Sequence, residues 1–232
     1  MGEFAQKRLI RKLDLERFLS KVAAQPTPQA RLEQYTVSAQ IAATMLYLAA
    51  YSNNDIVGKS VLDLGCGTGR LALAAAFLGA ESVVGVDIDK SAVMVAVENS
   101  SAAGFKGCVD WVAGDIDAVV GRFDTVVQNP PFGVQRRTAD RRFLEKALEL
   151  GCSVYSLHNH PEFDKKLSGR LKGSGGQLLQ VEASPFISRF VEDHGGKVEA
   201  VYALPLVIPK MFDFHTKARQ EIVIDLYVIR RS

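Results

Sequence analysis

From Ser60 onward the hydrophobic positions alternate between two periods, and this alternation predicts a sheet with helices between its strands. Short apolar runs rich in β-branched residues are typical of buried strands, and segments with helical spacing follow most of them. The predicted strands are 61–64, 82–87, 108–113, 123–128, 153–157, 197–207 and 221–229; the predicted helices are 69–78, 89–103, 138–150 and 185–194. This order indicates an α/β fold whose mostly parallel, seven-stranded sheet carries helices on both faces.

Residues before this region show helical spacing without a strand. We therefore expect a helical extension over residues 1–56 and one sheet domain over 57–232. Pro26 and Pro28 end the first helix of the extension, and Thr36 or Ser38 is expected to cap the second. Asp89 is expected to cap the helix 89–103 in the same way.

Composition narrows the class of protein. The chain has 232 residues, 47% of them hydrophobic, and a formal net charge of +2, so nucleic acid would have to be bound by a local patch. Cys66, Cys108 and Cys152 are widely spaced and odd in number, which predicts neither a disulfide framework nor a metal site. Without a long apolar run or a signal-peptide pattern, the sequence predicts a cytoplasmic protein with no membrane partner.

A glycine-rich turn, Asp63-Leu-Gly-Cys-Gly-Thr-Gly69, lies between the first predicted strand and helix of the sheet domain. Alternate glycines let the backbone turn tightly and approach a ligand. The spacing differs from the G-x-G-x-x-G of nicotinamide-binding proteins, and the acid before it suits a cationic ligand. S-adenosylmethionine, which carries an amine and a sulfonium, fits; the alternative is a purely structural turn. The candidate cofactor-binding residues here are Asp63, Gly65, Gly67, Thr68 and Gly69.

Two further acids follow predicted strands of this region. Asp87, with Ile88 next to it, is placed to accept hydrogen bonds from both ribose hydroxyls of an adenosyl cofactor. Asp115 is placed to accept from the amino group of the adenine, with Ile116 against the ring. The alternative for both acids is a solvated loop carboxylate.

The segment Asn129-Pro-Pro-Phe132 ends the fourth predicted strand, and its two prolines make it stiff. An adenine amino group is a poor nucleophile because its lone pair is delocalised into the ring. The Asn129 side-chain oxygen and the Pro130 carbonyl could hold its two N–H bonds out of conjugation, and both would bind more tightly as positive charge grows on nitrogen. Phe132 would stack on the base. The candidate catalytic residues are Asn129, Pro130, Pro131 and Phe132, and Asn129 is also a candidate cofactor-binding residue.

A run of positive charge follows this segment. Arg136, Arg137, Arg141 and Arg142 are candidate RNA contacts, because arginines beside the catalytic segment could bind phosphates. A solvated helix face is the alternative interpretation of such a run.

The order of glycine turn, ribose acid, Gly-Asp loop and Asn-Pro-Pro-Phe resembles the class I S-adenosylmethionine-dependent methyltransferases, whose domain is Rossmann-like. Three further pieces resemble the archaeal and eukaryotic methyltransferase-like family that modifies adenine N6 in small-subunit ribosomal RNA. They are 32–35, 154–158 and the tail from Leu204 through Lys217 to the final strand. The family usually carries lysine at the position of Asn159. The resemblance implies a cofactor pocket lined also by Gln34, Tyr35 and Thr36, and contacts to the target base and its phosphates by His158, Phe212, Phe214, His215 and Lys217.

The sequence thus predicts an S-adenosylmethionine-dependent RNA adenine-N6 methyltransferase acting on small-subunit ribosomal RNA. The resemblance further implies a small zinc-binding activator protein as a partner at an edge strand. The alternatives are a protein-glutamine methyltransferase acting on a release factor, a DNA adenine methyltransferase, and a non-catalytic RNA-binding scaffold of the same fold.

Overall fold

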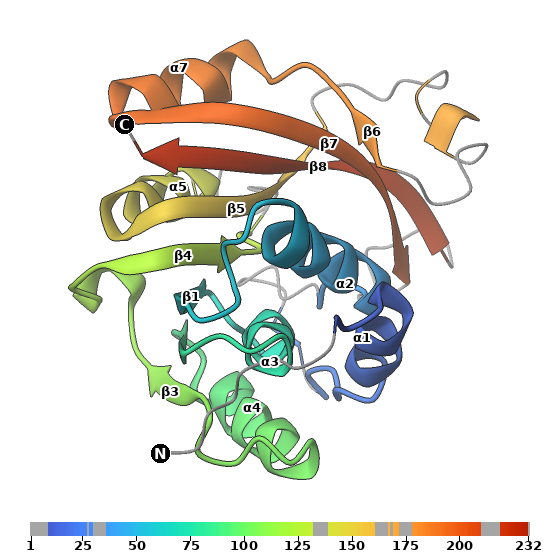
Figure 1. Ribbon diagram of the computed structural model, residues 1–232, viewed down its shortest axis with the longest axis vertical. Helices are drawn as coiled ribbons and strands as arrows, with labels where there is room; N and C mark the ends of the chain where they lie inside the picture. The colour runs from blue at the N-terminus through green and yellow to red at the C-terminus, as the bar shows by residue number, and fades with distance from the viewer. Residues whose placement is uncertain are drawn as a thin grey trace.

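The computed structural model describes residues 9–26, 28–29, 36–131, 139–160, 167, 169–171, 178–209 and 219–231. It has one central sheet with helices packed against it (Figure 1). The strands are β1 Ser60–Leu64, β2 Ser82–Asp87, β3 Asp110–Ala113, β4 Phe123–Gln128, β5 Gly151–Asn159, β6 Leu179–Gln180, β7 Gly196–Pro209 and β8 Arg219–Arg231. The helices are α1 Lys12–Leu19, α2 Ala39–Tyr47, α3 Arg70–Phe77, α4 Lys90–Ala102, α5 Ala139–Leu150 and α7 Pro185–Asp193, with a π-helical turn at Leu48–Ser52 and a 3-10 turn at Ile116–Ala118.

The sheet has the strand order β3-β2-β1-β4-β5-β8-β7-β6. The first five strands in this order pair in parallel, and β8, β7 and β6 pair antiparallel. The α/β, Rossmann-like, mostly parallel sheet predicted from the sequence is therefore confirmed. The expected number of seven strands is corrected to eight, because the two-residue β6 pairs with β7.

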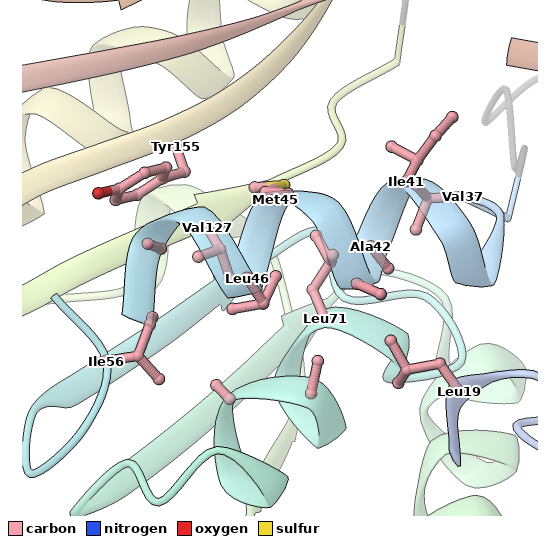
Figure 2. Packing of buried hydrophobic residues seen from close by; sticks show 14 of the residues in the cluster. Leu19, Val37, Ile41, Ala42, Met45, Leu46, Ile56, Leu71, Val127 and Tyr155 are labelled. Carbon is pink, nitrogen blue, oxygen red and sulfur yellow. The ribbon is translucent and has the colours of Figure 1, made fainter. Parts of the chain in front are cut away.

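Apolar residues fill both faces of the sheet. On one face, α1, α2 and α3 pack over β1, β4 and β5 in a shared hydrophobic core. Figure 2 shows Met45 and Leu46 of α2 between Leu71 of α3 and the strand residues Val127 and Tyr155. On the other face, α5 and α7 bury a second cluster against the same strands, with Leu144 and Ile187 among its members.

The N-terminal helices are part of the core. Leu15 and Leu19 of α1 are fully buried, and α2 is buried along most of its length. Ser38 caps α2 by accepting a hydrogen bond from the N–H of Ile41 at 3.2 Å, as one of the two predicted alternatives had it. These helices bury their apolar faces on the sheet itself, in the same core as the strands. The predicted domain boundary between residues 56 and 57 stays a prediction.

Candidate functional site

The glycine turn lies at the carboxyl edge of β1 and adopts left-handed backbone at each glycine. Gly65, Gly67 and Gly69 have backbone φ angles of 77°, 52° and 86°, which residues other than glycine rarely adopt. A Cβ on Gly65 would approach the Phe143 ring of α5 to 2.7 Å, and one on Gly69 would overlap the Trp111 ring of β3. A Cβ on Gly67 would have no neighbour within 4 Å, so the turn is open on that side. The turn therefore packs tightly at two glycines and leaves room at the third.

Asp87 at the end of β2 holds this turn in place. Its carboxylate accepts hydrogen bonds from the N–H groups of Gly67 and Asp89, both at 2.8 Å. Burial raises the pKa of Asp87, and these two donors partly offset that effect. Asp89 in turn caps α4 by accepting from the N–H of Ser91, which confirms its predicted role. Each Asp87 oxygen accepts one of these bonds and has a second lone pair, which could accept from a ribose hydroxyl.

Asp63 is an almost completely buried acid in β1, 1% exposed. Its Oδ2 accepts a hydrogen bond from the N–H of Ala72 at 2.8 Å, whereas its Oδ1 is buried and has no partner in the described part of the chain. The Thr68 hydroxyl is buried and unpartnered in the same way. Burial, reinforced by the charge of Asp87, raises the pKa of Asp63 to about 7. An unpartnered carboxylate oxygen at an open glycine turn fits a cationic group such as the amine of S-adenosylmethionine.

Asp115 follows β3 and is tied to α5. Its Oδ1 accepts from the N–H of Asp117 at 2.9 Å, and the guanidinium of Arg142 pairs with Asp115 and, at 2.6 Å, with Asp117. The Asp117 N–H and then Arg142 lower the pKa of Asp115, so this acid is ionised. Arg142 is therefore held between two carboxylates, and its contact with RNA stays a prediction.

The two isoleucines of the predicted pocket differ in accessibility. Ile116 is only 4% exposed and belongs to the core under α5, whereas Ile88 is 58% exposed beside Asp87. Of these two side chains, Ile88 thus has more surface to offer an adenine ring.

Asn129 lies directly beside the glycine turn. β1 and β4 pair with Leu64 opposite Gln128, so the next residues, Gly65 and Asn129, leave adjacent strands at the same edge. Pro130 is buried, and Asn129 and Pro131 are half-buried. The catalytic segment and the cofactor turn predicted from the sequence are thus brought together as far as Pro131.

His158 is buried and neutral, so it presents no positive charge to the site. It is 4% exposed, its Nε2 lies 2.8 Å from the Ser156 hydroxyl, and that hydroxyl accepts from Gln128 Nε2 at 2.8 Å. Its ring meets Tyr227 edge-on at 5.3 Å. Burial lowers the pKa of His158 to about 4, so the imidazole is neutral near pH 7. Sequence analysis missed Gln128 and Ser156, although polar residues at alternate strand positions were the available signal.

Arg70 and Asn99 are further residues that sequence analysis missed. Arg70, the first residue of α3, donates to the carbonyls of Val22 at 2.6 Å and Val37 at 2.5 Å. Asn99 of α4 exchanges two hydrogen bonds with the backbone of Ala23 and also donates to the carbonyl of Thr68 in the glycine turn. These contacts attach the chain before α2 to the turn, and no local sequence signal announces them.

Thr36, one of the pocket residues implied by the resemblance, is described and half-buried before α2. The structure does not extend to all the predicted residues. Those outside the described residues are Gln34, Tyr35, Phe132, Arg136, Arg137, Phe212, Phe214, His215 and Lys217.

The described residues contain no group of three or more His, Cys, Asp or Glu side chains that could hold a metal ion. No helix in that part of the chain is long and apolar enough to cross a membrane.

Comparison with known proteins gives consistent matches. The family model of the methyltransferase small domain matches residues 39–151. The rRNA N(6)-adenosine-methyltransferase METTL5 of Danio rerio is 34% identical over 218 residues, covering 91% of this chain and 95% of that protein. The protein MJ0284 of Methanocaldococcus jannaschii is 36% identical over 235 residues, covering 96% and 95%. The crystal structure of PH1948 from Pyrococcus horikoshii, 38% identical, superimposes with a TM-score of 0.79 over 97% of this chain and 99% of that one.

Proposed function

Since this chain belongs to the methyltransferase family that contains the METTL5 proteins, we propose that it methylates N6 of an adenosine in small-subunit ribosomal RNA. The chain is an S-adenosylmethionine-dependent methyltransferase. The observation that carries the choice of an amino group is the position of Asn129-Pro130 next to the glycine turn, on the strand paired with β1. The METTL5 name supports adenosine in rRNA as the substrate.

Asn129 and Pro130 bind the amino group that is to be methylated. Two oxygen acceptors, the Asn129 amide and the Pro130 carbonyl, take its two N–H bonds and turn the nitrogen lone pair away from the ring. Because the acceptors bind more strongly as the nitrogen becomes positive, they lower the barrier rather than merely holding the substrate. No general base is required, since the product amine releases its proton to water.

The cofactor is held at the open side of the glycine turn. Asp63 and Thr68 offer their unpartnered oxygens to its amine, Asp87 accepts from its ribose, and Ile88 contacts its adenine ring. S-adenosylmethionine supplies the electrophilic methyl group. The activator protein implied by the family and the cytoplasmic location predicted from the composition are parts of the same proposal.

Incubation with radiolabelled S-adenosylmethionine tests the substrate class. We expect methyl label in total RNA from cells lacking the gene, and N6-methyladenosine after nuclease digestion and chromatography. Label in protein would instead indicate the glutamine methyltransferase, label in DNA the DNA enzyme, and label in none of them the scaffold.

Asn129→Ala tests the catalytic role. We expect kcat to fall about 10²-fold or more with little change in cofactor affinity, because the lost acceptor acts mainly in the transition state. The measurements are single-turnover methyl transfer and calorimetric titration with S-adenosylmethionine. Equal losses of rate and cofactor binding would show that Asn129 holds the cofactor instead.

A further inference from the structure

Aromatic rings form a row along one face of α7. Phe186, Phe190 and His194 follow one another at four-residue spacing, with ring centroids 6.3 Å apart for the first pair and 4.2 Å apart for the second. Phe186, at the amino end of the helix, is 51% exposed. About half of the Phe186 side chain is thus accessible to a ligand.

An arginine of α5 lies over this exposed ring. The Arg141 guanidinium carbon is 4.5 Å from the centroid of Phe186, a cation–π distance. In the described part of the chain Arg141 has no carboxylate partner, unlike its neighbour Arg142, which is paired with Asp115 and Asp117. Among the described residues, the contact given for the Arg141 guanidinium is therefore an aromatic ring and not a carboxylate.

The pair lies on the rim of the candidate site. Phe143, two residues after Arg141, contacts the glycine turn at Gly65, which places the first turns of α5 at the carboxyl edge of the sheet. α7 packs beside α5 on the same face of the sheet. β8 is antiparallel to both β5 and β7, so β7 runs in the same direction as β5, toward the carboxyl edge. α7 precedes β7 and runs in the opposite direction, so its amino end lies at the carboxyl edge. Figure 1 shows α5 and α7 together, away from α1 and α2.

We propose that Phe186 and Arg141 form a stacking platform for a nucleobase next to the target adenosine, with the Arg141 charge directed to a phosphate of the same strand. Single-stranded RNA bases stack on aromatic rings and on guanidinium planes, and both are offered here together. An arginine without a carboxylate partner among the described residues complements a polyphosphate rather than an apolar protein surface. The inference rests on the proposed RNA substrate and adds a second binding site for it.

The test measures binding of the full chain to a fluorescein-labelled, uridine-rich single-stranded RNA with one adenosine. Phe186→Ala should weaken binding about ten- to hundredfold, the cost of losing one stacked base, while Phe186→Tyr should bind nearly as wild type. Arg141→Ala should weaken binding and also lower the slope of log K against log salt by about 0.7, the value for one phosphate on a single strand. Phe186→Ala should leave that slope unchanged.

Lys106→Ala is the matched control, because it removes one exposed positive charge between α4 and β3, away from the carboxyl edge. It should change neither affinity nor slope by the amounts seen for Arg141→Ala. Thermal unfolding midpoints near that of the wild type would show that the variants are folded. Binding of Phe186→Ala within twofold of wild type would overturn the platform and leave α7 as a surface for a protein partner. RNA labelling by the wild type in the methylation assay would then still support the proposed function, so the two ideas fail separately.

Discussion

Asp63 is the residue whose ionisation the site controls most directly. Its pKa is raised to about 7 because the carboxylate is buried, and one of its oxygens has no partner in the described chain. A cation bound at that oxygen favours the ionised carboxylate, so cofactor binding and deprotonation of Asp63 are coupled.

We therefore predict that affinity for S-adenosylmethionine rises with pH up to about pH 7, by at most about tenfold per pH unit. Calorimetric titration between about pH 5 and pH 8 measures this slope. Asp63→Asn should bind more weakly and lose the slope. Asp124→Asn, which changes an exposed carboxylate bound to Ser60 at the other end of the sheet, should keep it. An equal slope in Asp63→Asn and wild type would contradict the coupling.

Local sequence patterns predicted the polar residues at strand ends but not the residues whose contacts join parts of the chain far apart in sequence. Asp63, Asp87 and Asn129 lie at or next to the ends of β1, β2 and β4, and parallel strands end at one edge, so the sequence could place them together. Their roles in binding and catalysis stay predictions. That both oxygens of Asp87 bind backbone N–H groups could not be read from spacing. Nor could the burial of His158, because it depends on how β8 pairs with β5.

At the scale of elements, α3 and α4 fasten the N-terminal segment to the glycine turn. Arg70 binds carbonyls on both sides of the stretch between Val22 and Val37, and Asn99 joins Ala23 to Thr68. Thr36, predicted to line the cofactor pocket, directly precedes Val37. The segment and the turn should therefore loosen together when these contacts are removed.

Arg70→Ala should lower the free energy of unfolding by about 2 kcal/mol, because it leaves two part-buried carbonyls without their donor. The free energy of unfolding of Arg70→Lys should lie between those of the wild type and Arg70→Ala, since one ammonium cannot span both carbonyls. Cofactor affinity should fall in the same order. Urea unfolding and calorimetry measure the two effects.

Arg11→Ala is the control for this prediction. Arg11 also lies in the N-terminal region, but its side chain is 71% exposed and pairs only with Asp14 in the described chain. Its removal should change the free energy of unfolding much less than Arg70→Ala does, because an exposed ion pair contributes little to stability. If Arg70→Ala were no more destabilising than Arg11→Ala, Arg70 would not fasten the segment.

Element positions followed from the sequence more closely than element number. β2 and β4 begin and end at the predicted residues, because each is a short β-branched run between turn signals. β7 and β8 extend beyond the predicted ranges, since long antiparallel pairing with each other continues through residues that have weak strand signals. β6 was not predicted because a strand of two residues is too short to show an alternating hydrophobic pattern. It is defined by the pairing of its two residues with Ala203 and Tyr202 of β7.

At the scale of the whole molecule, buried ionisable groups make stability depend on pH in opposite directions. Burial raises the pKa of Asp63 and of Asp225, so their contribution is full at low pH and is lost as pH rises through the raised value. His158 acts in the other sense. Its pKa falls from 6.5 to about 4, so the folded protein binds fewer protons than the unfolded chain.

The contribution of His158 is therefore present above about pH 6.5 and is lost as pH falls toward about 4, with a limit of about 3 kcal/mol. The total profile mixes it with the acids, and a variant that carries the acids but not the imidazole separates them. His158→Gln is suitable because a glutamine amide can still hydrogen-bond to Ser156 and cannot take up the proton.

We predict that the difference in unfolding free energy between wild type and His158→Gln shrinks by about 2 kcal/mol between about pH 7 and about pH 5. Urea unfolding at several pH values gives this difference directly, and the acids cancel from it. The imidazole joins β4 to β5 through Ser156 and Gln128 and packs against Tyr227 of β8, so its protonation should weaken three adjacent strands at once. A difference that stays constant with pH would mean that His158 reaches water and titrates normally, in which case it could face the substrate after all.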